Sequence, residues 1–534
     1  MSQKGTLFVR STSGLARSVT TFDAFTFGFF MMGVGPIGAI VYGMGASIFP
    51  SGNIGLAVLI STIGAMFTTS VYAMLTAAMP RSGGDYTYVS RILHPSIGFA
   101  GNFNWALLNI FWVASDALLL VYFVGIACYG LAVVTGNTAL MAAGTALSLD
   151  LNTIAAATVV TIIAAGLVAA AGIKWCTRIQ VVGFAVSVLG LIVAIGFFGS
   201  TSNPDFIVKY DAVMGQNAYM NVIDAARNAG FVPGGGGNWL IPTLGIAAMA
   251  CMATLYGMFS TFIGGEVKNA GSVRTQMKAM IGSTVFSGLS IAIVGFLVVY
   301  SVGQDYLGAV NYILYSDPAS YPFLTAPYYN LLGAIASNNA WIALIFGISF
   351  LPIGVVWCIG CTLVATRCMF AWSFDRVVPS QIAYVDPRTR SPVVATLVVI
   401  VVATILGAVL VYNQALYYML FGSIAGTLFS MVAVMIAGII FPYRRKDIYD
   451  KSPSAQKVGG IPLVSILSLI ALAFLGLFLY FYLGYPEIGF WAPLSVGLFV
   501  GVWVVGFAIY AVSYLVRRSQ GIDLGMLFRE IPPG

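Results

Sequence analysis

A stripe of polar and aromatic residues could bind a small ligand inside an otherwise apolar part of the chain. Asn102, Trp105, Asn109, Trp112 and Asp116 follow one another at intervals of three and four residues, which places them on one face of a helix. Asp116 is the only Asp, Glu, Lys or Arg deep within a long apolar segment. Such an acid could bind and release a proton, or pair with a cationic group of a ligand. It could equally be a structural acid, protonated or hydrogen-bonded to a neighbouring helix, and the residues alone leave these interpretations open.

Glycine and proline interrupt another apolar segment, which contains MGVGPIGA at 32–39. Pro36 lacks an amide hydrogen, and the glycines around it allow the backbone to unwind. A weaker interruption, LYGMF, surrounds Gly257 at 255–259. One interpretation is a pair of kinked helices that pack closely through their glycines. The other, which the pairing favours, is two broken helices that face a midplane binding site, as in inverted-repeat transporters.

These segments belong to a series of stretches long enough to cross a bilayer, which takes about 20 apolar residues. Of the 534 residues, 59% are hydrophobic and only 8% are charged, whereas about 25% are charged in soluble domains. The predicted spans lie near 24–49, 54–79, 97–132, 151–173, 179–199, 239–265, 279–303, 337–366, 392–412, 415–441, 462–484 and 490–516. We therefore predict an all-α polytopic membrane protein with about 12 transmembrane helices. The polar, basic first 20 residues lack a signal-peptide pattern, so we expect the first span to be retained.

The basic residues predict the orientation of the chain. Every Lys and Arg except Lys209 and Arg227 falls in the two tails or in connections on the same side as the tails. Because cytoplasmic loops are enriched in Lys and Arg, both termini are predicted to be cytoplasmic. The net charge of +7 thus reports topology, and it does not indicate a nucleic-acid partner.

The connections between spans differ in character. The two longest, 200–238 and 304–336, are rich in aromatic residues and poor in charge, which favours packed caps over disorder, with a short surface helix near 218–230. The connection 442–460 is charged, and we expect it to be mobile. All six Cys lie within spans or, for Cys176, beside one, so no disulfide framework is indicated.

Three motifs on the predicted cytoplasmic side carry a family resemblance. They are PRSGGDYTYVSR at 80–91, GGEVKN at 264–269 and RCMFAWSFDRVVPSQIAYVDPRTRSP at 367–392. Each resembles a segment of the amino acid–polyamine–organocation (APC) superfamily of transporters, in family order and beside the expected spans. The resemblance covers the chain up to about 441.

The resemblance implies a five-plus-five inverted repeat followed by two additional C-terminal helices. The implied organisation is a cytoplasmic N-terminal tail (1–21), a first repeat (22–199), an extracellular loop (200–238), a second repeat (239–441), a cytoplasmic loop (442–461), two further transmembrane helices (462–516) and a cytoplasmic C-terminal tail (517–534). The substrate would lie between the broken spans 1 and 6. Matching the family's breaks and adding two nearby aromatic residues gives the candidate substrate-binding residues Gly33, Val34, Gly35, Pro36, Ile37, Tyr256, Gly257, Met258, Phe259 and Trp112.

The chain departs from the family pattern at positions that concern ion coupling. Phe259 stands where some members have an acidic residue, and Ser187 lies near the depth at which some proton-coupled members have a Lys. Asp116 is then the candidate coupling residue.

The motif charges could form a gate. Arg81, Asp85, Arg91, Glu266, Lys268, Arg367, Asp375 and Arg376 could be loop charges that only fix the topology. Alternatively, they form a network that closes the cytoplasmic side. We favour Arg81, Glu266 and Asp375 as gate residues, because each adjoins a helix end that alternating access would have to move.

The sequence therefore predicts a secondary active transporter in the plasma membrane that moves amino acids or related amines, by ion-coupled symport (proton or sodium) or by exchange. A nutrient sensor or channel on the same scaffold, or a transporter of polyamines or nucleobases, remains an alternative. An enzyme is not expected: HExxH, GxSxG and Cys/His metal patterns are absent, and so is a GxxxxGK[ST] nucleotide motif. We expect neither a cofactor nor a bound metal.

Overall fold

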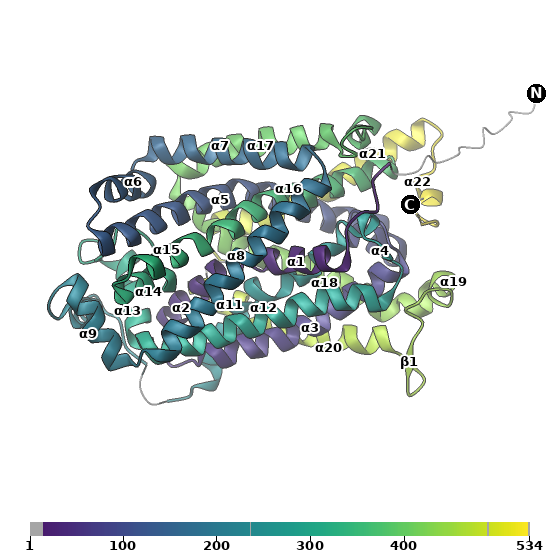
Figure 1. Ribbon diagram of the computed structural model, residues 1–534. Coiled ribbons are helices and arrows are strands. Elements are labelled where there is room, and N and C mark those ends of the chain that lie inside the picture. The colour runs from purple at the N-terminus through teal and green to yellow at the C-terminus, as the bar shows by residue number, and fades with distance from the viewer. Residues whose placement is uncertain (1–13, 235–236, 489–490, 532–534) are drawn as a thin grey trace, which may run out of the picture.

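The chain forms a bundle of long helices, and the computed structural model describes residues 14–234, 237–488 and 491–531 (Figure 1). Twelve helical segments in this part of the chain are long and apolar enough to cross a membrane. The predictions of an all-α polytopic protein and of about 12 spans are confirmed. The relation of the two halves as inverted repeats stays a prediction.

The spans consist of single helices or of two consecutive helical pieces. They are α1 with α2 (Thr21–Met31, Pro36–Ile48), α3 (Ile54–Ala78), α5 (Pro95–Thr135), α7 (Leu151–Ala170), α8 (Ile173–Ser200), α11 (Leu240–Thr254) with the 3-10 helix η1 (Leu255–Thr261), α12 (Val273–Val302), α15 with α16 (Ala340–Ser349, Leu351–Phe374), α17 (Val393–Tyr412), α18 (Gln414–Arg444), α20 (Leu463–Gly484) and α21 (Pro493–Ser519). Shorter elements join them. These are α4 (Asp85–Ile92), α6 (Thr138–Leu149), α9 (Asn203–Met214), α10 (Ala218–Asn228), η2 (Gly264–Glu266), α13 (Gln304–Ser316), α14 (Tyr329–Ser337), η3 (Ser380–Ala383), α19 (Lys446–Tyr449), β1 (Lys457–Val458), β2 (Ile461–Pro462), η4 (Pro486–Ile488) and α22 (Leu524–Leu527).

Both predicted interruptions are present. The first span stops being helical after Met31 and resumes at Pro36, whose missing amide is harmless at the first position of a helix. Gly33 between them has φ +60°, a conformation that favours glycine. The span Leu240–Thr261, called span 6 below, changes from α to 3-10 geometry at Leu255. The sequence therefore located both changes of helix geometry.

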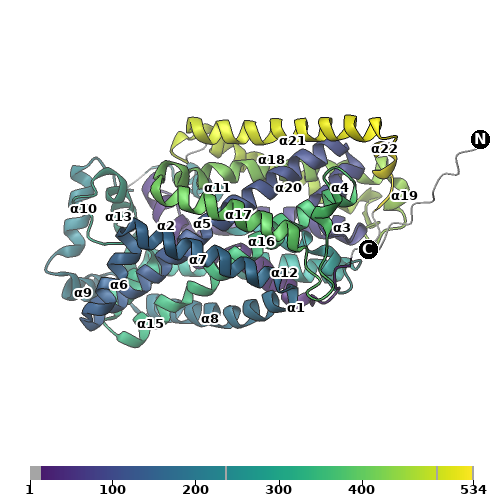
Figure 2. The same cartoon turned by 90° about the horizontal axis from the view of Figure 1, so that it is seen from above.

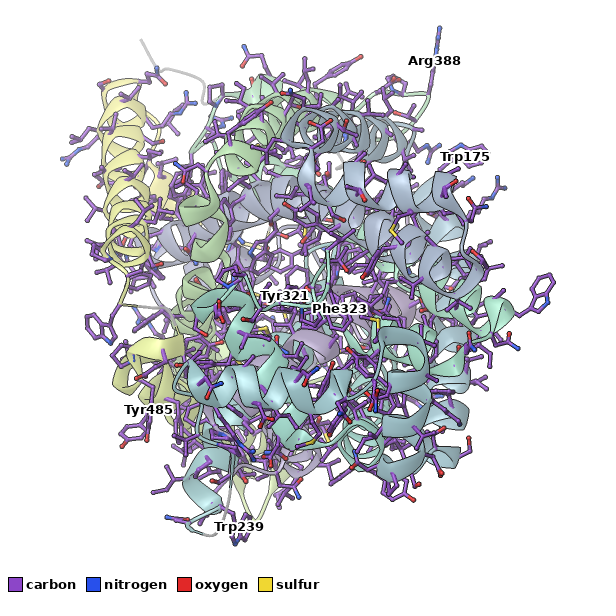
Figure 3. All side chains as sticks on the ribbon, turned by 90° about the vertical axis from the view of Figure 1, so that its left-hand side faces the viewer. Trp175, Trp239, Tyr321, Phe323, Arg388 and Tyr485 are labelled. Atoms are coloured by element: carbon purple, nitrogen blue, oxygen red, sulfur yellow. The ribbon has the colours of Figure 1, made fainter. Side chains whose placement is uncertain are left out.

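The start of α1 and the C-terminal α22 lie at one end of the bundle, and α9, α10 and α13 lie at the other (Figures 1 and 2). We call these the terminal end and the cap end. At the cap end, Tyr219 stacks on Tyr306 with ring centroids 4.5 Å apart, and the Tyr306 hydroxyl donates to that of Tyr210 at 2.7 Å. Figure 3 shows Tyr321 and Phe323 near the centre of this end. The long connections form packed caps, as the sequence predicted, and α10 is the expected surface helix.

The connection 442–460 differs from the expectation of a mobile segment. It contains α19 and the start of an antiparallel hairpin in which Val458 pairs with Ile461. The buried Ser454 hydroxyl donates to the carbonyl oxygen of Met74 at 2.6 Å and fixes the segment to α3. The charge pattern of the sequence could not predict this contact, because the residue that makes it is one uncharged, buried serine.

Pairs of hydroxyl groups join α3 to span 6 and to α12. The pairs are Ser61 with Thr254 at 2.9 Å, Thr69 with Thr284 at 3.3 Å, and Thr76 with Thr261 at 2.7 Å. In each pair either oxygen can donate. The two contacts to span 6 lie near the two ends of η1. Helix α3 therefore contacts span 6 both where the 3-10 segment begins and where it ends.

Candidate functional site

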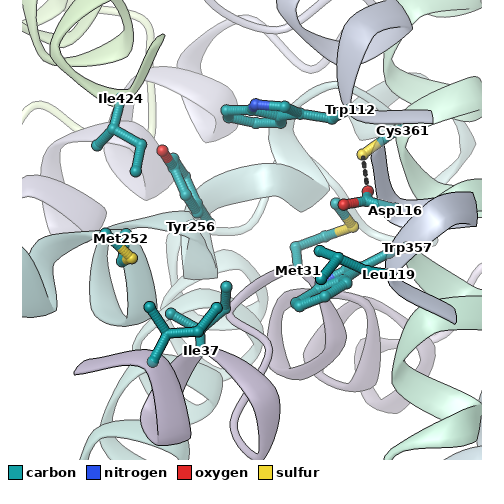
Figure 4. Close-up of a pocket in the computed structure, with 11 residues that line it drawn as sticks. Met31, Ile37, Trp112, Asp116, Leu119, Met252, Tyr256, Trp357, Cys361 and Ile424 are labelled. Atoms are coloured by element: carbon teal, nitrogen blue, oxygen red, sulfur yellow. Dashed lines mark hydrogen bonds between the residues drawn. The ribbon is translucent and has the colours of Figure 1, made fainter. Parts of the chain in front are cut away.

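A pocket lies where the two interrupted spans meet α5, α16 and α18 (Figure 4). Its walls are Met31, Ile37, Ile40, Trp112, Asp116, Leu119, Met252, Tyr256, Trp357, Cys361 and Ile424. Most of these side chains are apolar, and two are tryptophans. An apolar pocket with a few convergent polar groups is typical of a small-molecule site.

Asp116 is the only acidic residue among the residues that line the pocket. It is buried, and its Oδ2 accepts a hydrogen bond from the Cys361 thiol at 3.5 Å (Figure 4). In the part of the chain that the structure describes, the ion pairs involve other acids. Among the described residues, the carboxyl group thus has a weak neutral donor, the Cys361 thiol, and takes part in no ion pair.

The opposite wall of the pocket carries Tyr256 from span 6. Its hydroxyl lies 3.2 Å from the Thr427 hydroxyl, and its ring lies 5.4 Å from the ring of Trp112. Trp112 also stacks on Phe259, with ring centroids 6.5 Å apart. A rearrangement of the 3-10 segment would therefore change the aromatic wall of the pocket.

Two buried ion pairs lie at the terminal end, and we call them the gate pairs. Glu266 accepts from Arg367 at 2.9 and 3.0 Å, and both side chains are 1% exposed. Asp375 accepts from Arg91 at 2.8 and 2.7 Å, with similarly low exposure. The ring of Phe528 covers the Arg91 guanidinium at 4.9 Å. These pairs join the loop after span 6 to α16, and α16 to α4.

Comparison with protein families decides what kind of protein carries this pocket. The family model described as amino acid permease matches residues 21–515, which is nearly the whole chain. The chain belongs to the amino acid permease family. No curated protein matched the chain in the comparison. Family membership and the twelve apolar helices make this protein a membrane transporter, in agreement with the APC resemblance.

The polar stripe of α5 is divided between two regions of the permease. Trp112 and Asp116 line the pocket. Asn109 donates to the backbone oxygen of Trp105 within the same helix at 2.8 Å. Asn102 lies toward the terminal end, where its amide donates to Asp85 at 2.8 Å. One face of α5 therefore runs from the pocket toward the gate pairs.

The first break contributes to the permease pocket through few side chains. Ile37 lines it. Gly33 packs so closely on Trp357, another lining residue, that a Cβ atom at position 33 would overlap the indole. Val34 and Gly35 instead border a separate small cavity with residues of α8, α14, α15 and α16. Pro36 begins α2. In this turn the amide of Gly33 donates to the backbone oxygen of Phe30 at 2.8 Å, and the amide of Ile37 donates to the backbone oxygen of Gly33 at 2.9 Å.

The candidates in span 6 occupy three different environments. Tyr256 lines the pocket, whereas Met258 and Phe259 are fully buried, and the ring of Phe259 stacks on the lining residue Trp112. A Cβ atom at Gly257 would meet Thr284 and the Met280 backbone oxygen of α12. The sequence indicated Gly257 as the centre of a helix break and as a candidate substrate-binding residue. In the structure its missing side chain allows close packing of span 6 on α12.

Several lining residues were not among the sequence candidates: Met31, Ile40, Leu119, Met252, Trp357, Cys361 and Ile424. The spacing of Trp357 and Cys361 by four residues is the one signal that could have paired them on a face of α16. Arg91 and Arg367, which the sequence left open as loop charges or members of a network, are the partners of two predicted gate residues. The third, Arg81, lies outside both pairs and donates to the Pro80 backbone oxygen at 2.9 Å.

Proposed function

We propose that this permease moves amino acids or closely related amines across the plasma membrane by alternating access. The observation that carries the proposal is the pocket at the two helix interruptions, which is apolar apart from Asp116 and a few hydroxyl, thiol and indole groups. The apolar walls suit the side chain of a neutral amino acid. Interruptions of the two spans supply backbone groups for its charged ends.

The charged ends of an amino acid match the two interruptions. The start of α2 carries the positive end of a helix dipole, which favours a carboxylate. At the junction of α11 with η1 the hydrogen-bond pattern changes, so carbonyl oxygens there can accept from an ammonium group. We therefore propose Gly33, Val34, Gly35, Pro36 and Ile37 as the carboxylate side, and Tyr256, Gly257, Met258 and Phe259 as the ammonium side.

Asp116 is our candidate for the group that couples transport to a proton gradient. Its burial in the pocket and its neutral partner Cys361 support this role. A carboxyl group in such a place can take up a proton in one state and lose it in another. Sodium coupling and obligatory exchange are the alternatives. A variant of Asp116 without the carboxyl group would distinguish them from proton coupling.

The gate pairs would close the cytoplasmic side in this cycle. Glu266 ends η2, the short helix after span 6, and Asp375 follows α16 directly. Movement of either element away from its arginine partner would open a path at the terminal end. We propose Glu266 and Asp375, with Arg91 and Arg367, as this gate, and we place Arg81 beside it.

Thermal unfolding of the purified protein with amino acids, polyamines and nucleobases tests the proposed substrate class. We expect neutral amino acids with apolar side chains to raise the apparent stability, by about 2.7 kcal/mol at a hundredfold excess over Kd. Stabilisation by nucleobases or polyamines alone would contradict the proposal. Uptake of the stabilising amino acid into proteoliposomes then separates a transporter from a sensor, and currents far above turnover rates would indicate a channel.

Labelling of intact cells tests the predicted orientation with two matched variants. Val208 of α9 and Val458 of β1 are both exposed, at 71% and 56%. A membrane-impermeant thiol reagent should modify Val208→Cys and spare Val458→Cys, because Val458 lies at the terminal end. The parent chain, with its six native Cys, provides the background. The reverse pattern would place both termini outside.

A further inference from the structure

A third buried acid lies near the gate pairs and forms no ion pair with the residues that the structure describes. Asp85 is the first residue of α4 and is 3% exposed. Glu266 and Asp375 each face an arginine, whereas the ion pairs among the described residues do not include Asp85. Its Oδ1 accepts from the Asn102 amide at 2.8 Å. A negative charge on Asp85 is therefore met by neutral groups.

The surroundings of Asp85 are polar but uncharged at neutral pH. The groups that face it are Tyr72 of α3, Tyr88 of α4, Asn102 and Trp105 of α5, and Cys368 of α16. The Tyr72 hydroxyl is buried and has no hydrogen-bond partner among the described residues. Burial raises the pKa of Asp85 to about 7, although the hydrogen bond from Asn102 lowers it.

Asp85 is tied to the parts of the bundle that carry the gate pairs. The Asn102 amide donates to the Gly83 oxygen at 2.9 Å as well as to Asp85, and its oxygen accepts from the Trp372 indole at 2.7 Å. The Gly83 amide in turn donates to the oxygen of Phe262, directly after η1, at 2.9 Å. One cluster thus links α4 and α5 to α16 and to the end of span 6. Opening of the gate pairs would separate these elements and admit water to Asp85.

From this geometry we propose that Asp85 is a proton-binding site that controls the gate: it holds a proton while the terminal end is closed and releases it when that end opens. The proposal rests on the proposed function, because it takes the terminal end to open during transport. It differs from the role of Asp116, which lies in the substrate pocket and would respond to a gradient across the membrane. Asp85 would respond to the pH on the cytoplasmic side.

The direction of the pH effect follows from the two states. A hydrated Asp has a pKa of about 3.9, whereas the pKa of Asp85 in the closed structure is about 7. The closed state binds the proton more tightly, so acid favours the closed state. Between about pH 4 and about pH 7, the ratio of open to closed protein should rise up to tenfold for each pH unit. Above about pH 7 both states are ionised and the ratio levels off.

The first experiment uses the ligand-free, full-length protein and so does not depend on the substrate. In the unfolded chain Asp85 also has a pKa of about 3.9, so the contribution of its proton to stability falls as the pH rises toward about 7. We expect the thermal midpoint of the wild type to fall between about pH 5 and about pH 7 and then to level off. Asp85→Asn should flatten this fall, because the amide does not titrate.

Three matched variants identify the group that titrates. His94→Asn removes the single histidine and keeps a residue able to cap α5, and Asp450→Asn removes an exposed acid of the cytoplasmic connection. Asp116→Asn removes the other buried acid that lacks an arginine partner. His94→Asn and Asp450→Asn should keep the wild-type fall, whereas Asp116→Asn should remove only the share that Asp116 itself contributes. A wild type without this fall, or an Asp85→Asn protein that retains it, would overturn the proposal.

The second experiment measures exchange of labelled leucine in proteoliposomes at equal pH on both sides. Wild-type exchange should slow as the pH is lowered from about 7, up to tenfold for each unit where opening limits the rate. Asp85→Asn should be slow and independent of pH. Retained pH dependence in that variant would reject Asp85 as the gate proton site. Absence of leucine binding and exchange in the wild type would count against the proposed function, while the first experiment would still decide on Asp85.

A further variant, Asn102→Ser, keeps the carboxyl group and so serves if Asp85→Asn does not fold. The shorter side chain loses its hydrogen bond to the ionised carboxyl, which raises the pKa of Asp85. The midpoint of the pH dependence should therefore move to higher pH. An unmoved midpoint would contradict the proposal.

Discussion

Glu266→Gln should destabilise the closed terminal end by about 3–5 kcal/mol, because it leaves the Arg367 guanidinium buried beside a neutral group. Both partners are 1% exposed, so water cannot compensate the lost charge without opening of the structure. The measurement is the thermal midpoint of the purified protein, together with the rate of amino acid efflux from proteoliposomes. We expect a lower midpoint and faster opening at the terminal end.

Two controls separate the loss of a buried pair from a general effect of removing an acid. Glu266→Gln combined with Arg367→Met replaces the pair with uncharged groups and should recover much of the stability. Asp447→Asn breaks an exposed pair, in which the Asp447 side chain is 63% exposed, and should change stability by less than about 1 kcal/mol. If the double variant were no more stable than the single one, an unpaired arginine would not be the cause.

Asp116→Asn should abolish accumulation of substrate driven by a pH gradient and leave exchange of substrate for substrate largely intact. The amide keeps the shape of the side chain beside Cys361 but can no longer bind and release a proton. Uptake into proteoliposomes with and without a pH gradient, compared with exchange at equal pH, measures the two modes in one preparation.

Other roles of Asp116 predict different results. If the carboxylate pairs with the ammonium group of the substrate, binding and exchange should fall together while the protein remains stable. A structural acid predicts loss of both modes with a lower thermal midpoint. Unchanged pH-driven uptake in the variant would reject Asp116 as the coupling residue and favour sodium coupling or obligatory exchange.

Much of the fold was predictable, because the bilayer imposes strong rules on the sequence. Gaps between charged residues located the twelve spans, and Pro36 with its glycines located the first break. Trp112 and Asp116 were found because they stand out on an otherwise apolar helix. Trp357 and Ile424 line the same pocket but lie on apolar spans, where a residue that faces a ligand looks like one that faces lipid or core.

The pairing of the gate charges was harder to predict than their presence. Glu266 and Asp375 were chosen because they adjoin helix ends, but each had several arginines within the same group of motifs. Which arginine lies opposite depends on how α4, α16 and the end of span 6 meet in space. Gly257 shows the same difficulty, since its sequence position indicated a break and only the packing revealed that it faces α12.

The hydroxyl pairs between α3 and span 6 bear on how fast the transporter can change state. A hydroxyl group rotates and both donates and accepts, so Ser61 and Thr76 can exchange Thr254 and Thr261 for new partners as span 6 shifts. Hydrogen bonds between membrane helices are worth about 0.6 kcal/mol each on average. We therefore expect a movement of span 6 along α3 to cost little free energy at these hydroxyl pairs. We expect the barrier to a movement of span 6 to lie mainly at its terminal end, where the ion pair of Glu266 with Arg367 would have to separate.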